Sequence, residues 1–111
     1  MLVELNVFSG KPNPCWQLDE RSAQELRHLH SLLTVATGGA SEPPALGYRG
    51  FSYTDATETC HAFRGIVRTP RAVLADESFS IERFLLDRLP PEFAALRERV
   101  ASELDKDKTG R

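Results

Sequence analysis

The stretch FSGKPNPCW, residues 8–16, combines polar side chains with residues that interrupt regular structure. Lys11 supplies a cation, and Ser9 and Asn13 supply a hydroxyl and an amide. Gly10 would let the backbone come close to a bound group, and a helix start just beyond it would offer unpaired N–H groups to an anion. This segment therefore suits an anion or carboxylate pocket. The same residues would also make a rigid turn whose tryptophan only covers the core.

A second stretch, LGYRGF, places Tyr48 and Arg49 between Gly47 and Gly50. Glycines allow unusual backbone angles or close approach of another chain segment. The planar guanidinium of Arg49 could clamp a carboxylate. It could equally stack on Trp16 or Tyr48, or pair with a surface acid. The ligand-binding candidates are therefore Ser9, Lys11, Asn13, Trp16, Tyr48 and Arg49.

The soft metal ligands of the chain are Cys15, Cys60, His28, His30 and His61. Cys60 and His61 are adjacent, so on a strand their side chains face opposite sides. His28 and His30 are two residues apart, which separates them on a helix. Neither a C-x-x-C nor an H-x-x-x-H motif is present, so we expect no metal site and no cofactor.

Nucleophilic and acid–base catalysis have little support in the sequence. A helix start close behind Cys15 could lower the pKa of its thiol, but no family signature surrounds either cysteine, and no serine lies in a G-x-S-x-G elbow. Most carboxylates fall on expected helix surfaces or caps, where they are solvated. We expect two free thiols, assign no catalytic residue, and leave open whether the chain is an enzyme.

Hydrophobic periodicity predicts the elements that carry these residues. Alternation predicts a strand over residues 2–8, and Asp19 is a typical N-cap for a helix over residues 20–36. The remaining expected elements are a strand around Phe51 and Tyr53, a turn at 55–59, a strand over 61–68 with 72–74 as its continuation, a helix from about 77 that Pro90-Pro91 ends, and a helix over 93–104.

The resulting order, β-α-β-β-α-α, predicts an α+β fold. We expect a small two-layer sandwich with a mainly antiparallel sheet of three or four strands and helices on one face. One domain would span residues 1–105, followed by a frayed polar tail, 106–111. If the first two strands are antiparallel, the loop over residues 9–16 meets the segment 47–50 at one sheet edge. Trp16 would then plug the core, with Tyr48 or Arg49 against its ring.

The composition and charge of the chain limit the classes of partner that we expect it to bind. The chain has 111 residues, of which 41% are hydrophobic and 27% charged, and its net charge is −2. It has no basic field for nucleic acid, no basic start followed by an apolar run, and no apolar run approaching about 18 residues. We therefore expect a cytoplasmic protein that binds neither nucleic acid nor membrane. The free sheet face and the apolar stripe over 93–104, which is either core or a dimer face, favour a protein partner or a homodimer.

The two motifs VFSGKPNPCW and LGYRGF together resemble a pattern of short uncharacterised bacterial and fungal proteins, VFSG-x-PNP-x-W followed by LGYRGF. The resemblance covers the N-terminal half well and the C-terminal half loosely. It brings no activity and no catalytic residues. It implies only that the residues of the two motifs work together. Cys15 stands where the pattern has Ser or Thr, which weakens a role for its thiol.

Two functions follow as hypotheses. The first is a non-catalytic protein- or peptide-binding domain, of an accessory or immunity type. The alternative is a small enzyme or small-molecule binder that takes an anionic ligand between the Ser9–Trp16 loop and the Gly47–Gly50 segment.

Overall fold

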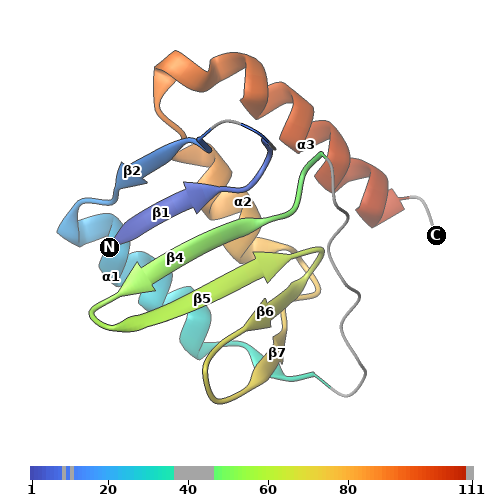
Figure 1. Ribbon diagram of the computed structural model, residues 1–111. Coiled ribbons are helices and arrows are strands. Elements are labelled where there is room, and N and C mark those ends of the chain that lie inside the picture. Colours follow the sequence, from blue (N-terminus) through green and yellow to red (C-terminus); the bar gives the residue numbers. More distant parts are fainter. Residues whose placement is uncertain (9, 11, 37–46, 110–111) are drawn as a thin grey trace.

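The computed structural model describes residues 1–8, 10, 12–36 and 47–109, apart from the side chains of residues 106–109. The elements in Figure 1 are β1 (Leu2–Leu5), β2 (Cys15–Gln17), α1 (Glu20–Ser31), β3 (Thr34–Val35), β4 (Phe51–Asp55), β5 (Glu58–Phe63), β6 (Ile66–Arg68), β7 (Val73–Ala75), α2 (Ser80–Asp87), the 3₁₀ turn η1 (Pro91–Phe93) and α3 (Ala94–Thr109). The α+β class is confirmed. None of the helices in the described part is long and apolar enough to cross a membrane.

One antiparallel sheet forms the front layer of the molecule. Within the described ranges its seven strands run in the order β2-β1-β4-β5-β6-β7-β3, and each neighbouring pair is antiparallel. The helices α1 and α2 lie behind the sheet, and α3 packs beside α2 (Figure 1). The first strand and the strand at Phe51 are antiparallel neighbours, which meets the condition set above for contact at one sheet edge; Leu5 lies opposite Phe51.

The sheet is larger than the three or four strands predicted. The expected strand over 61–68 is two strands, because Arg64 and Gly65 take positive φ values of 52° and 79° and turn the chain from β5 into β6. The first helix ends at Ser31 rather than at 36, because Thr34 and Val35 form β3, which pairs with β7 as the last strand of the sheet. The short strand β2 lies inside the predicted loop.

Caps set the helix starts. The Asp19 side chain accepts a hydrogen bond from the Ser22 amide at 2.7 Å, which confirms the predicted N-cap of α1. The next helix begins at Ser80 rather than at about 77. The buried Asp76 carboxylate accepts hydrogen bonds from the amides of Ser80 (3.1 Å) and Ile81 (2.8 Å). The helix α3 includes residues 106–109 of the predicted polar tail; residues 110–111 lie outside the described residues.

The core lies between the sheet and the helices. Its fully buried side chains include Val3, Leu5, Leu26, Phe51, Val67, Ile81, Leu85, Val100 and Leu104. The apolar stripe of the last helix is therefore core: Leu96, Val100 and Leu104 are buried within the same chain. The radius of gyration, 13.2 Å, is close to the value of about 13 Å expected for one compact domain of this length.

Gly47 and Gly50 both have positive φ values but lie in different surroundings. Gly47 and Gly50 have φ of +82° and +92°. A Cβ on Gly50 would lie 2.2 Å from the Ala62 carbonyl oxygen and 2.9 Å from the Phe63 Cβ, whereas no described atom lies within 4 Å of a Cβ on Gly47. The β4–β5 pairing therefore requires glycine at position 50 for space as well as for conformation.

We expect Gly47→Ala to lower the free energy of unfolding by about 1–2 kcal/mol, the cost of a left-handed conformation. Gly50→Ala carries the same strain and also the clash with backbone, so it should cost about 1–3 kcal/mol more. Urea denaturation of both variants measures the difference. Equal losses would show that the β4–β5 pair yields to the added methyl group.

Candidate functional site

Asn13 is a structural residue of the N-terminal loop. Its Oδ1 accepts hydrogen bonds from the amides of Val7 (3.0 Å) and Phe8 (2.7 Å), and its Nδ2 donates to the Glu4 carboxylate at 3.0 Å. The amide thus holds the chain as it leaves β1. Ser9 and Lys11, the other polar candidates of this loop, lie outside the described residues.

Trp16 packs on the core from β2, but its neighbours differ from those predicted. It lies opposite Val3, whose side chain is buried, so the indole is on the helix side of the sheet. The indole meets the ring of Phe51 edge-on, at 6.5 Å between centroids. The aromatic partner is therefore Phe51 and not Tyr48 or Arg49, because the sheet register brings β2 and β4 to the two sides of β1.

Arg49 holds backbone of the N-terminal segment. Its guanidinium donates a hydrogen bond to the Phe8 carbonyl, and its amide donates to the Asn6 carbonyl at 2.8 Å. The Asn6 amide donates in return to the Gly50 carbonyl at 2.9 Å. Residues 6–8 and 49–50 therefore lie side by side, directly before the loop that was expected to make this contact. His61 Nε2 donates to the Arg49 carbonyl at 2.7 Å, and burial lowers the pKa of this histidine.

Tyr48 is hydrogen-bonded to Glu82, a buried residue that was not among the predicted site residues. Its hydroxyl donates a hydrogen bond to the carboxyl group of Glu82 on α2, whose side chain is 1% exposed. The other carboxyl oxygen accepts from the Gly65 amide at 2.8 Å. Burial raises the pKa of Glu82 although these hydrogen bonds oppose the shift. The assignment of helix carboxylates to solvated surfaces is therefore wrong here. Glu82 shares the helical spacing of Leu85, Leu86 and Leu89, and that spacing was the available signal.

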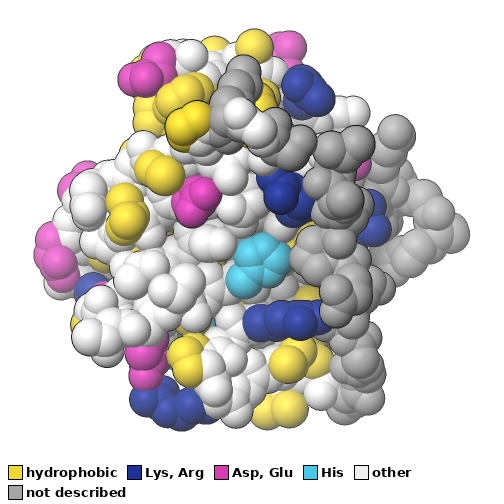
Figure 2. Space-filling view, in the orientation of Figure 1, with side chains coloured by type: hydrophobic (Ala, Val, Ile, Leu, Met, Phe, Trp, Pro, Cys, Tyr) yellow, Lys and Arg dark blue, Asp and Glu magenta, His cyan; other side chains and the backbone are white. Residues whose placement is uncertain are grey.

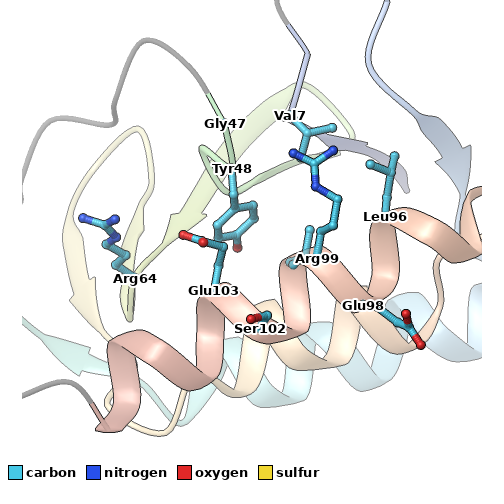
Figure 3. Close-up of a pocket in the computed structure, with 10 residues that line it drawn as sticks. Val7, Gly47, Tyr48, Arg64, Leu96, Glu98, Arg99, Ser102 and Glu103 are labelled. Carbon is cyan, nitrogen blue, oxygen red and sulfur yellow. The ribbon is translucent and has the colours of Figure 1, made fainter.

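A cleft of about 580 Å³ lies between α3 and the non-strand segment before β4 that carries Tyr48. Figure 3 shows Tyr48 with Arg99 and Glu103 of α3 around it. The lining residues are Val7, Gly47, Tyr48, Arg64, Leu96, Glu98, Arg99, Val100, Ser102 and Glu103. The sequence placed a pocket at the Gly47–Gly50 segment, and the cleft includes Gly47 and Tyr48. Among the described residues its opposite wall comes from α3, and neither Arg49 nor a described residue of the Ser9–Trp16 loop is part of the lining.

The cysteines offer no activated thiol. Cys15 is exposed, Cys60 is half-buried, and both are free, as predicted. Burial raises the pKa of both thiols, helped by Glu4 at Cys15 and by Glu58 and Asp55 at Cys60. The hypothesis that a helix start lowers the pKa of Cys15 is wrong, because Cys15 lies on β2 beside Glu4. Among the described residues no three His, Cys, Asp or Glu side chains form a group that could hold a metal ion.

Comparisons with known proteins add no relative: no family model, no curated protein and no solved structure matches this chain. The resemblance carried by the two N-terminal motifs stays an expectation.

The two buried tyrosines allow a matched prediction. Tyr48→Phe removes the hydroxyl that donates to Glu82 and leaves a buried carboxyl oxygen without this donor, so it should lower the free energy of unfolding by about 1–3 kcal/mol. Tyr53→Phe removes a buried hydroxyl that has no partner among the described residues, so it should leave the stability unchanged or raise it. Urea denaturation compares the two. A loss in Tyr53→Phe as large as that in Tyr48→Phe would contradict the assignment.

Glu82 should give the protein a distinctive pH dependence. Because its pKa is raised above the ordinary value of 4.5, the folded state holds the proton more tightly than the unfolded chain does. The stability that the neutral carboxyl contributes is complete below that value and is lost as the pH rises through the folded pKa. Glu82→Gln keeps the size of the side chain without its titration. The variant should therefore gain stability relative to the original protein as the pH rises from 4.5, measured by chemical denaturation across pH. Parallel profiles would contradict it.

Proposed function

We propose that this chain is a non-catalytic binding module that holds a peptide segment of a partner protein in the cleft between α3 and Tyr48. The observation that carries the proposal is the lining of the cleft. The half-buried Val7 and the small exposed parts of Tyr48 and Leu96 supply its apolar surface, and charged side chains of both signs line it with them. At about 580 Å³ the cleft lies within the size range of ligand sites, about 300–1,000 Å³.

The charges favour a peptide over a small anion. Among the described lining residues, Arg64 and Arg99 are matched in number by Glu98 and Glu103, so the formal charge of this part of the lining is close to zero. A phosphate or carboxylate would meet repulsion from two carboxylates along with attraction from two guanidinium groups. A peptide carries both donors and acceptors along its backbone and apolar side chains between them, which suits a mixed rim over an apolar floor.

The groups beneath the cleft favour binding rather than catalysis. The Tyr48 hydroxyl is engaged with Glu82, and Glu82 is not part of the lining. This buried pair fixes the tyrosine ring in one position. A rigid aromatic wall supports affinity because little side-chain freedom remains to be lost on binding.

The free face of the sheet is a weaker candidate for the partner. We expected this free face to favour a protein partner, but Figure 2 shows a histidine near its centre, beside Lys or Arg side chains, with hydrophobic side chains scattered around them. Register places Glu4, Ser52, His61 and Arg68 in one row across it. A polar row of this kind is typical of a solvated antiparallel sheet.

A peptide selection tests the proposal. The immobilised protein is offered a library of random displayed peptides, and enriched peptides are measured by fluorescence anisotropy. Ser102→Trp fills the cleft from an exposed position of α3 and should weaken binding at least about tenfold. Ser78→Trp introduces the same side chain at an exposed position outside the lining and should bind like the original protein.

Two outcomes would contradict the proposal. The first is that no peptide is enriched, or that the enriched peptides bind Ser102→Trp and the original protein equally. The second is that small carboxylates raise the melting temperature, that Ser102→Trp abolishes this shift, and that peptides have no effect. That pattern would establish the anionic small-molecule site instead.

A further inference from the structure

Arg99 and Glu103 are oppositely charged residues of α3 that line the cleft and lie four residues apart. Figure 3 shows the Arg99 guanidinium directed toward Val7 and the Glu103 carboxylate directed toward Tyr48. Glu98, the other acidic residue of the described lining, points away from Tyr48 in this view. The helix therefore presents a positive group and a negative group to the cleft, one turn apart.

Other charged residues of α3 hold the helix in place. Arg97 donates a hydrogen bond to a backbone carbonyl oxygen at 3.1 Å, and Asp105 accepts one from Arg83 of α2 at 3.0 Å. Among the described residues, Arg99 and Glu103 form no hydrogen bond or ion pair, although Glu103 is half-buried. A half-buried carboxylate has lost part of its hydration, so it gains from a partner of opposite charge. Both groups are therefore available to a ligand in the cleft.

The spacing of the two charged residues matches that of an extended peptide. Four residues of an α-helix rise about 6 Å, and two residues of an extended chain advance about 6.6 Å. Side chains two positions apart in an extended chain point to the same side. A peptide that lies along α3 can therefore place one side chain at Arg99 and the next side chain of the same side at Glu103.

A helical peptide suits this cleft less well. Such a peptide docks by burying an apolar face in a hydrophobic groove. Among the described lining residues, apolar surface comes from the half-buried Val7 and the small exposed parts of Tyr48 and Leu96. An extended peptide depends less on an apolar face, because its backbone N–H and C=O groups can bond the polar side chains of the lining.

We propose that the peptide bound in the cleft is extended and carries an acidic and a basic residue two positions apart, the acidic side chain at Arg99 and the basic one at Glu103. This inference rests on the proposed function and specifies the chemistry of the partner. A peptide with the two charges exchanged would meet like charges at both positions, and such contacts exclude wrong partners. The two charged contacts therefore set the position of the peptide along α3.

An exchange of charges within the peptide tests this pairing on the unaltered protein. The peptides that the selection enriches and that bind Ser102→Trp weakly should contain the acidic and basic pair. In one of them the two charged residues are exchanged, which keeps its length, composition and net charge. Fluorescence anisotropy should show that the exchanged peptide binds at least about tenfold more weakly, because both contacts become repulsive.

Variants of the protein provide the complementary test. The double variant Arg99→Glu, Glu103→Arg keeps the net charge of the protein and should reverse the preference, so that the exchanged peptide binds more tightly than the original one. An acidic residue four positions before a basic one is also favourable within a helix, and circular dichroism verifies that the variant is folded. Glu103→Gln should weaken the original peptide several-fold. Its matched control, Glu98→Gln, removes the carboxylate that points away from Tyr48 and should change the affinity less than about twofold.

The results separate this inference from the proposed function. The inference alone is overturned if peptides that depend on the cleft lack the charged pair, bind equally well after the exchange, or keep their preference on the double variant. It is also overturned if the required charges lie four positions apart in the peptide, the spacing of a helical ligand. If no selected peptide is sensitive to Ser102→Trp, the proposed function fails and this inference fails with it.

Discussion

The buried carboxyl group of Glu82 is the point on which this fold converges. Glu82 lies on α2. Its carboxyl oxygens accept one hydrogen bond from the Tyr48 hydroxyl, in the segment before β4, and one from the Gly65 amide, in the turn between β5 and β6. Three parts of the chain that are distant in sequence are thereby fixed to one side chain. Desolvation makes a buried carboxyl costly unless its oxygens are satisfied, so these parts must assemble together for any of them to be stable.

The hydrogen bonds of Glu82 are accompanied by unusual backbone conformations in the segments around it. The turn that presents the Gly65 amide takes φ of +79°, and a Cβ at that position would lie 2.8 Å from the Phe79 ring. Phe79 itself adopts φ of +59° immediately before α2. The start of α2 is fixed by hydrogen bonds to Asp76, so the helix that carries Glu82 is held at its first turn. Positive φ values at a turn and at a helix start are thus compensated by hydrogen bonds to two buried carboxyl groups.

Hydrophobic periodicity predicted the elements that are long enough to show a regular pattern. The alternation in residues 2–5 and the helical spacing that begins at Leu26 of α1 are simple patterns. The strands β2 and β3 have three and two residues, too few to show a period, so their pairing with distant strands decides their structure. Arg64-Gly65 ends β5 by a turn that hydrophobicity does not mark.

The candidate sites show the same division. The LGYRGF motif pointed to Gly47 and Tyr48, which line the cleft, but its other wall comes from a helix about fifty residues later, and no local pattern predicts that approach. Asn13 and Arg49 were candidates because they are polar and lie beside glycine or proline. Asn13 accepts from the amides of residues 7–8 and donates to the Glu4 carboxylate, and Arg49 donates to the carbonyls of residues 6 and 8. A sequence cannot distinguish such internal bonds from bonds to a ligand.

The short strands at the two ends of the sheet have a consequence for behaviour at high concentration. A sheet of this width presents two open edges whose backbone groups could pair with those of another molecule. Among the described residues the edges are β2, with three residues, and β3, with two. Each of these strands therefore offers only a few backbone donors and acceptors to a strand from a second chain. The long central strands β4 and β5, which would be the dangerous ones, are covered on both sides by their neighbours. In the described part of the chain, the strand order leaves only short strands at the edges, and short edges limit strand pairing between molecules.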